Sequence, residues 1–172
     1  MKRAGGRSDA GYNAPTAVGD TAHIIVAAEL TNNAADMGQL VPMLKAVKAN
    51  TGKDPEQALA DAGYRSEKNF KDLADSPKVL VVALGREGKR CVEIDAKKNP
   101  HTAAMAAKMQ TEGGKAAYRR RQVWIAEPSK GWIKSVLGFR QFSLRGLPRV
   151  QAEFKLVCLA LNLRRMGAMK AV

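Results

Sequence analysis

The sequence predicts an α/β fold, because strand-like and helix-like segments alternate along the first half of the chain. Short apolar runs, typical of strands, occur before and after segments whose apolar residues repeat at helical spacing. Glycine or proline marks several of the boundaries between these segments. The 172 residues and the apolar content of 45% suit one globular domain with a sizeable core.

Two strands joined by a tight turn begin the predicted fold. Residues 11–18 and 23–31 have strand character, and Gly19 and Asp20 between them suit a hairpin turn. Residues 1–10 are rich in glycine and basic side chains, and no apolar segment of a secretion signal follows them directly. We expect residues 1–10 to form a flexible lead-in to the domain.

A helix is predicted next, with Asp36 as its cap and Gly52 as its end. Pro42 is compatible with this helix only near the first turn, since proline lacks the backbone donor that later turns need. The apolar residues at helical spacing are Met37, Leu40, Val41, Leu44 and Val47.

A second strand, a short helix and a third strand follow. The apolar run 58–60 ends at Asp61, and Gly63 marks a turn. A short helix is expected between Ser66 and Pro77, and residues 78–84 form a run typical of a buried strand.

The second half of the chain is predicted to be mostly helical. Residues 85–100 are polar and suit a loop, and residues 101–112 suit a helix. Residues 116–137 form a longer helical candidate with an interruption near Pro128. A final helix is expected at about residues 149–166.

Positive charge is concentrated at the C-terminal end. Residues 113–172 contain 13 Lys and Arg against two acids, Glu127 and Glu153, whereas residues 1–112 are close to neutral, and the whole chain carries +13. Such a basic field points to nucleic acid or, less well, to an anionic membrane surface. The apolar runs are too short to span a bilayer, and two cysteines are too few for a disulfide framework, so a cytosolic protein is expected.

Two acids are candidate metal ligands. Asp61 follows a strand-like run, and ligands gather at the carboxyl ends of strands in α/β sheets, although a simple turn Asp fits the same position. Glu127 is expected on a helix face that also carries Arg120, Lys130 and Lys134, where a surface ion pair is the simpler interpretation. Hard cations such as Mg²⁺ prefer oxygen ligands. Two such metal ions, held by carboxylates, can activate a water or hydroxyl group and stabilise a leaving phosphate oxygen.

Several motifs, in one order, resemble the catalytic domain of bacterial insertion-sequence transposases of the DDE type. The first three are Gly-Tyr-Asn-Ala at 11–14, the apolar segment 26–32, and Leu-Ala-Asp-Ala-Gly-Tyr-Arg-Ser-Glu at 59–67. The later ones lie at residues 125–128, 131–134, 137–142, 144–146 and 156–163. The similarity covers nearly the whole chain from residue 11.

The resemblance implies an RNase H-like fold, in which helices flank a mixed sheet, and three acids that bind two Mg²⁺ ions, with Mn²⁺ as an alternative. It implies that Asp61 is the second Asp, that Glu127 is the Glu, and that Lys134 contacts DNA near the transposon end. The family's Tyr and Arg before the Glu have no match in register, since Tyr118 and Arg121 lie two residues early.

The first Asp of the family pattern lies on a strand upstream of the Gly-Tyr-Asn-Ala motif, and neither Asp9 nor Asp20 matches its place. We therefore expect residues 11–172 to be a partial catalytic domain, incomplete at the N-terminal strand. The isolated chain is expected to be inactive or impaired.

The expected partner is double-stranded DNA at transposon ends, in the bacterial cytoplasm and in association with the nucleoid, with a second copy or an intact transposase as a protein partner. The alternatives are a non-catalytic DNA-binding or dimerising remnant and a basic RNA-binding structural protein, which the aromatic content of 5% disfavours. The basic residues expected to contact DNA are Arg119, Arg120, Arg121, Lys130, Lys134, Arg140 and Arg145.

Overall fold

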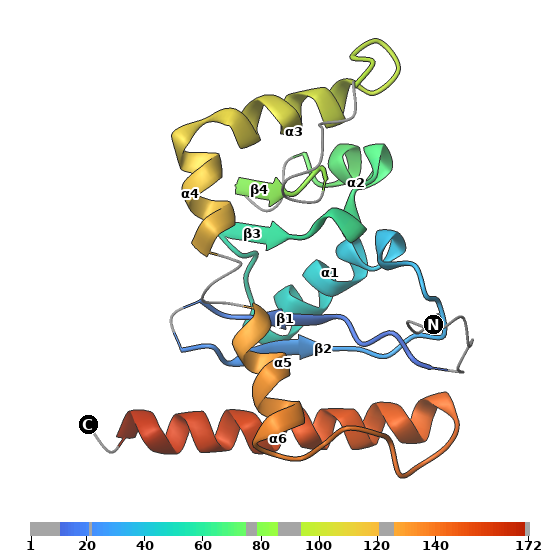
Figure 1. Ribbon diagram of the computed structural model, residues 1–172, viewed down its shortest axis with the longest axis vertical. Coiled ribbons are helices and arrows are strands. Elements are labelled where there is room, and N and C mark those ends of the chain that lie inside the picture. Colours follow the sequence, from blue (N-terminus) through green and yellow to red (C-terminus); the bar gives the residue numbers. More distant parts are fainter. Residues whose placement is uncertain (1–10, 21, 75–78, 86–93, 121–125, 171–172) are drawn as a thin grey trace.

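The computed structural model describes residues 11–20, 22–74, 79–85, 94–120 and 126–170. The predicted lead-in, residues 1–10, lies outside these ranges. The described part is an α/β structure, as the sequence predicts: strands lie at its centre, and helices lie around and beyond them (Figure 1). None of the described helices combines the length and hydropathy that a membrane span needs.

The predicted hairpin is present. Strands β1 (Thr16–Val18) and β2 (Ile25–Ala28) pair antiparallel, with a register shift between Ala17 and Val18. An isolated bridge between Asn13 and Thr31 extends the pairing beyond the strand ends.

Helix α1 (Leu40–Thr51) corresponds to the first predicted helix, but its start differs from the prediction. Asp36 does not cap α1; it begins the 3-10 turn η1 (Asp36–Gly38), and Gln39 is the residue that precedes the helix. Pro42 therefore lies in the first turn, where proline is tolerated. Gly52 ends the helix as predicted, with a left-handed φ of 76° that glycine adopts without steric cost.

The next unit joins two parallel strands through a short helix. Strand β3 (Gln57–Ala60) pairs in parallel with β4 (Val79–Val82), with Ala60 opposite Val82. The 3-10 turn η2 (Ala62–Tyr64) and helix α2 (Glu67–Asp72) follow β3. These elements agree with the predicted strand, turn, helix and strand.

Four helices follow in the described part of the chain: α3 (Pro100–Gln110), α4 (Glu112–Arg120), α5 (Ala126–Ser135) and α6 (Leu147–Lys170). The helix predicted at 116–137 overlaps the end of α4 and all of α5, and residues 121–125 between them lie outside the described ranges; α4 begins earlier than predicted, at Glu112, and α5 ends at Ser135. Helix α6 extends beyond the predicted 149–166 at both ends.

The described strands form two separate two-stranded sheets, rather than one continuous mixed sheet. In the view of Figure 1 the strands follow one another in the order β4, β3, β1, β2. Helix α1 contacts both sheets: Met43 and Val47 pack with Ala27 of β2, and Leu40 packs with Ala60 of β3. A break between β3 and β1 agrees with the expected α/β fold that is incomplete at one strand.

The outer edge of β2 is covered by side-chain amides of α6. Asn162 accepts a hydrogen bond from Ile25 N and donates one to Ile25 O, both at 2.8 Å. Gln151 accepts from Leu30 N and donates to Ala28 O. These contacts satisfy backbone groups that an edge strand otherwise exposes, and they fix α6 along the hairpin.

Candidate metal and DNA-binding site

Asp61 lies where the sequence predicts it, at the carboxyl end of the parallel strand β3. It follows β3 directly and precedes η2, with extended backbone (φ −84°, ψ 178°). Its Oδ1 accepts a hydrogen bond from Gly63 N at 3.0 Å, which orients the half-buried carboxylate. Here Asp61 acts as a turn Asp, and it also occupies the strand-end position at which α/β sheets bind ligands.

A second carboxylate, that of Asp36, lies beside the same turn. A Cβ added to Gly63 would lie 2.9 Å from Asp36 Oδ2 and 3.1 Å from Asp61 Oδ1. Both carboxylates therefore face one side of Gly63, and the missing side chain of this glycine makes the space for them. The sequence predicts Asp36 only as a helix cap; Gly63, two residues after Asp61, marks the turn, but no pattern in the sequence links it to Asp36.

Asn13, the polar residue of the first motif, orients the Asp36 carboxylate. Its Nδ2 donates a hydrogen bond to Asp36 Oδ1, while its backbone N–H and C=O both pair with Thr31 at 2.9 Å. The side chain that orients Asp36 is thus itself anchored to the hairpin. Two motifs far apart in the sequence meet at this point, since Gly63 belongs to the third motif.

Asn69 ties the two 3-10 turns together. Its side chain is buried, and Nδ2 donates to Met37 O of η1 at 2.6 Å and to Tyr64 O of η2 at 3.0 Å. Asp36 begins η1 and Asp61 precedes η2, so these bonds help to fix the separation between the two carboxylates.

The donor set suits a hard divalent cation only in part. Carboxylate oxygens are the ligands that Mg²⁺ prefers, and Asp36 and Asp61 supply them at one place. Among the residues that the structure describes, no group of three His, Cys, Asp or Glu lies together. Glu127 is the second residue of α5, but its side chain lies outside the described part. That Asp61 and Glu127 converge therefore stays a prediction.

Glu67, the last residue of the third motif, has a structural role. Its Oε1 accepts from His101 N, and its Oε2 accepts from the N–H and Oγ1 of Thr102, at 2.7–2.8 Å. Partial burial tends to raise the pKa of this carboxyl, but the hydrogen bonds from Thr102 and His101 outweigh it, so the pKa lies below its usual value. Glu67 therefore holds the N-terminus of α3 against α2.

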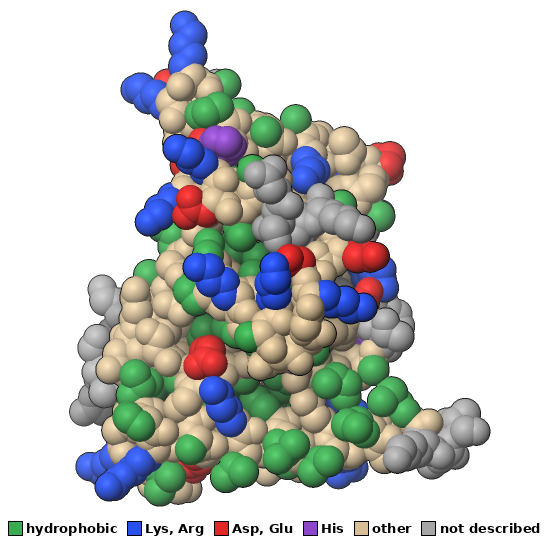
Figure 2. All heavy atoms as spheres, turned by 180° about the vertical axis from the view of Figure 1, so that it is seen from behind, with side chains coloured by type: hydrophobic (Ala, Val, Ile, Leu, Met, Phe, Trp, Pro, Cys, Tyr) green, Lys and Arg blue, Asp and Glu red, His purple; other side chains and the backbone are tan. Residues whose placement is uncertain are grey.

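The basic residues expected to contact DNA lie mostly on exposed positions. Lys130 and Lys134 are exposed on α5, Arg140 and Arg145 are exposed in the segment before α6, and Arg119 is exposed at the end of α4. Figure 2 shows Lys and Arg side chains spread over several parts of one face of the molecule, with Asp and Glu side chains among those near its middle.

Arg120 and Arg121 differ from the other residues that are expected to contact DNA. Arg120 forms an ion pair with Asp20, in the turn of the hairpin, so its guanidinium already has an anionic partner. Arg121 lies outside the described residues. The pair of Arg120 with Asp20 also attaches the end of α4 to the β1–β2 sheet.

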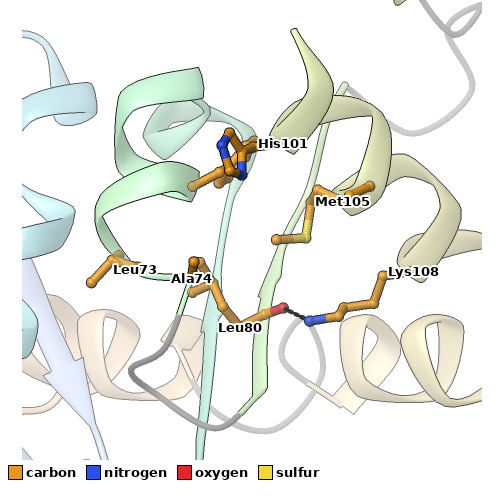
Figure 3. A pocket seen from close by; sticks show the side chains of 8 residues that line it. Leu73, Ala74, Leu80, His101, Met105 and Lys108 are labelled. Carbon is orange, nitrogen blue, oxygen red and sulfur yellow. Dashed lines mark hydrogen bonds between the residues drawn. The ribbon is translucent and has the colours of Figure 1, made fainter. Parts of the chain in front are cut away.

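A small cavity of about 180 Å³ lies between α2, β4 and α3, and Figure 3 shows the side chains around it. Lys108 Nζ donates to Leu80 O at 3.2 Å across one side of it. No carboxylate lines the cavity, so it does not offer the oxygen ligands that a magnesium site needs. Its lining residues are Phe70, Leu73, Ala74, Leu80, His101, Ala104, Met105 and Lys108.

Residues 84–167, just under half of the chain, match the family model of the transposase DDE domain. Comparison with curated proteins and with solved structures gave no significant match. The matched span contains Glu127, Lys134 and most of α6, whereas Asp36 and Asp61 precede it. Over this span the chain is similar to the transposase DDE domain, in agreement with the resemblance carried by the motifs between residues 125 and 163.

Proposed function

We propose that the chain is the C-terminal part of a DDE transposase catalytic domain that cuts and joins DNA strands at transposon ends. Asp61 and Glu127 are the proposed metal ligands, for Mg²⁺ or alternatively Mn²⁺. A pair of such ions, when bound, would activate the attacking oxygen and stabilise the leaving one. The observation that carries this proposal is the position of Asp61, a carboxylate held at the end of β3 beside Asp36.

The remaining residues of the site have positioning roles in this proposal. The Gly63 amide fixes the rotamer of Asp61, and Asn13 fixes that of Asp36. Preorganised carboxylates bind a cation without the cost of ordering them at the moment of binding. Lys134 and the exposed arginines around it would hold DNA phosphates near the ions.

An additional strand that carries the first Asp would fit between the two sheets, next to β1 on one side and β3 on the other. The outer edge of β2 is occupied by Gln151 and Asn162, so a strand joining this sheet would add along β1. Strand β3 is the neighbour of β1 in the strand order of Figure 1, and its pairing with β4 leaves its other edge without a strand in the described part of the chain. A strand between β1 and β3 would join both sheets and place a third acid near Asp61.

Complementation tests this proposal. Mg²⁺-dependent nicking of a transposon-end DNA is measured for the chain alone and for the chain fused to an upstream segment that supplies one strand with an Asp. We expect little activity from the chain alone and clear activity from the fusion. Asp61→Ala and Glu127→Ala should each abolish that activity, whereas Asp72→Ala, at an exposed position of α2, should retain it.

Two outcomes would count against the proposal. Strong nicking by the chain alone, lost in Asp61→Ala, would refute the claim that the chain is impaired. A fusion whose activity survives both Asp61→Ala and Glu127→Ala would refute the assignment of the two ligands.

The second candidate function is a non-catalytic DNA-binding or dimerising remnant, and the exposed basic residues of α5 and the segment before α6 favour it. It predicts DNA binding that needs no Mg²⁺ and weakens steeply with salt. Lys134→Ala and Arg145→Ala should each lower the slope of log K against log salt by about 0.9. Arg120→Ala should lower it less, since Asp20 already neutralises that charge. Binding that is independent of salt would exclude both functions.

A further inference from the structure

Helix α6 has two apolar faces, and only one of them is covered in the described part of the chain. Val150, Phe154, Cys158 and Leu161 are buried against the β1–β2 sheet and α5. Large apolar side chains on the opposite side are half to two-thirds exposed, and Figure 2 shows hydrophobic side chains along the lower edge of the molecule, where α6 runs. These residues, here named the α6 stripe, are Leu156 (66%), Leu159 (50%), Leu163 (59%) and Met166 (47%).

The spacing of the stripe indicates a helix as its partner. Leu156, Leu159, Leu163 and Met166 follow one another at intervals of three, four and three residues. This is the spacing of a seam between two packed helices, in which each side chain fits between those of the facing helix. Contiguous apolar patches of this kind are rare on the free surface of monomers.

The charged side chains beside the stripe are held on the protein itself. Lys155 Nζ forms an ion pair with Glu29 Oε1 at 3.2 Å. Glu153 accepts hydrogen bonds from the amides of Ser143 and Leu144, at 2.8 and 3.0 Å. Neither side chain needs an external partner of opposite charge.

The two arginines near the C-terminal end of α6 also contact their own chain. The guanidinium of Arg164 lies 5.0 Å from the centre of the Trp132 ring, and Arg165 donates to Ser129 Oγ at 3.2 Å. The stripe is therefore uncharged on a chain with a net charge of +13. An anionic membrane or an acidic protein would be recognised by cations that face outward, whereas two equally basic chains meet best where charge is absent.

An apolar groove beside the stripe can receive side chains from a facing helix. It has a volume of about 440 Å³ and is formed by α6 and the segment that follows α5. Leu156 belongs to both the groove and the stripe, so the two form one surface. The groove is lined by Leu137, Phe139, Ser143, Glu153, Leu156, Val157 and Ala160.

We propose that the α6 stripe is a dimer interface with a second copy of this chain, in which the two α6 helices pack antiparallel about a two-fold axis that passes between Leu159 and Leu163. Leu159 then faces Leu163 of the partner copy, and Leu156 faces its Met166. The antiparallel arrangement keeps the arginine-rich ends of the two helices apart. Specific interfaces bury on the order of 1,000 Å², and the exposed side chains of the stripe together with the groove beside it are the apolar surface that each copy offers.

The dimer is tested on the full chain by analytical ultracentrifugation over a range of concentrations. We expect a reversible monomer–dimer equilibrium in the wild type. The double variant Leu159→Glu/Leu163→Glu places two charges from each copy in the seam and should weaken dimerisation by at least about 100-fold. Because both side chains are already half exposed, its circular dichroism spectrum should match that of the wild type.

Met37→Glu is the matched control, since Met37 is 51% exposed and lies in η1 rather than on the stripe; this variant should dimerise as the wild type does. A wild type that stays monomeric at 100-fold the protein concentration used in the nicking assay would overturn the proposal. So would a dimer that survives in the double variant, or one that Met37→Glu disrupts equally. The result is independent of the proposed catalytic function, because no DNA or metal is present.

Discussion

Asp36 and Asp61 lie 25 residues apart in the sequence, yet oxygens of both carboxylates lie close to the same point, at 2.9 and 3.1 Å from where a Cβ of Gly63 would be. Asp36 is oriented by Asn13, and Asp61 by the Gly63 amide. The site therefore depends on a glycine that leaves this volume empty.

Gly63→Ala should displace the Asp36 carboxylate and break its hydrogen bond with Asn13, since a contact of 2.9 Å is too short for a Cβ. We expect a loss of about 1 kcal/mol in the free energy of unfolding. If Asp61 is a metal ligand, the variant should also bind Mg²⁺ about 10-fold or more weakly. Titration calorimetry measures this on the chain fused to the upstream segment that supplies a strand with an Asp. Gly38→Ala is the control, because nothing lies within 4 Å of that Cβ position; equal effects in both variants would contradict the crowding argument.

Asn162→Ala should destabilise the protein markedly. The side chain makes two hydrogen bonds to the backbone of Ile25, a residue that is only 6% exposed. Its removal leaves a buried donor and a buried acceptor unsatisfied, which should cost about 2–4 kcal/mol in urea unfolding.

Asn50→Ala is the comparison for this effect. Asn50 also bonds the backbone of β2, at Val26 O, but at an exposed position where water can replace it. The expected loss is below about 1 kcal/mol. Equal losses in the two variants would show that the α6 amide does not hold the strand edge.

Glu67→Gln should change how stability depends on pH. The pKa of Glu67 in the folded protein lies below its ordinary value of 4.5, so its carboxylate stabilises the fold above pH 4.5, and this contribution is lost as the pH falls through the lowered pKa. The variant should therefore be less stable than the wild type at pH 7, and the difference should shrink in acid. Urea midpoints at pH 7 and at pH values below 4.5 measure this.

The control for the pH effect is Glu112→Gln, whose side chain is 93% exposed and pairs only with Lys115 among the described residues. Its difference from the wild type should be small at every pH. A Glu67→Gln deficit that is constant down to the lowest pH would mean that the carboxylate charge is not what holds α3.

The adjacent glycines Gly113 and Gly114 of α4 should respond in opposite directions to alanine. A Cβ at Gly114 would lie 2.2 Å from Lys108 O, a backbone atom that cannot move aside, whereas nothing lies within 4 Å of a Cβ at Gly113. Gly114→Ala should open the junction of α3 and α4 and destabilise the protein by more than about 2 kcal/mol. Gly113→Ala should stabilise it by about 0.5 kcal/mol, since alanine favours helix. Thermal melts compare the two, and a loss in both would disprove the steric account.

Elements that depend on local chemistry could be predicted from the sequence. The hairpin follows from two strand-like runs around Gly19, and the end of α1 follows from Gly52, which adopts a positive φ. The position of Asp61 at a strand end follows in the same way, because the apolar run before it and the turn residues after it are adjacent in sequence. Helix boundaries were less secure: Asp36 begins η1 and does not cap α1, and α6 extends beyond the predicted 149–166, because helical spacing alone does not show where a helix starts or stops.

By itself, the sequence determined the α/β pattern, the concentration of positive charge after residue 112, and the motifs that resemble those of the transposase DDE domain, all of which depend on neighbouring residues or on composition. Only the tertiary structure placed Asp36 beside Asp61, brought Asn162 to the edge of β2, and left the α6 stripe uncovered. These relationships join residues tens to more than a hundred positions apart. They result from how helices pack on the two sheets, which periodicity along the chain does not specify.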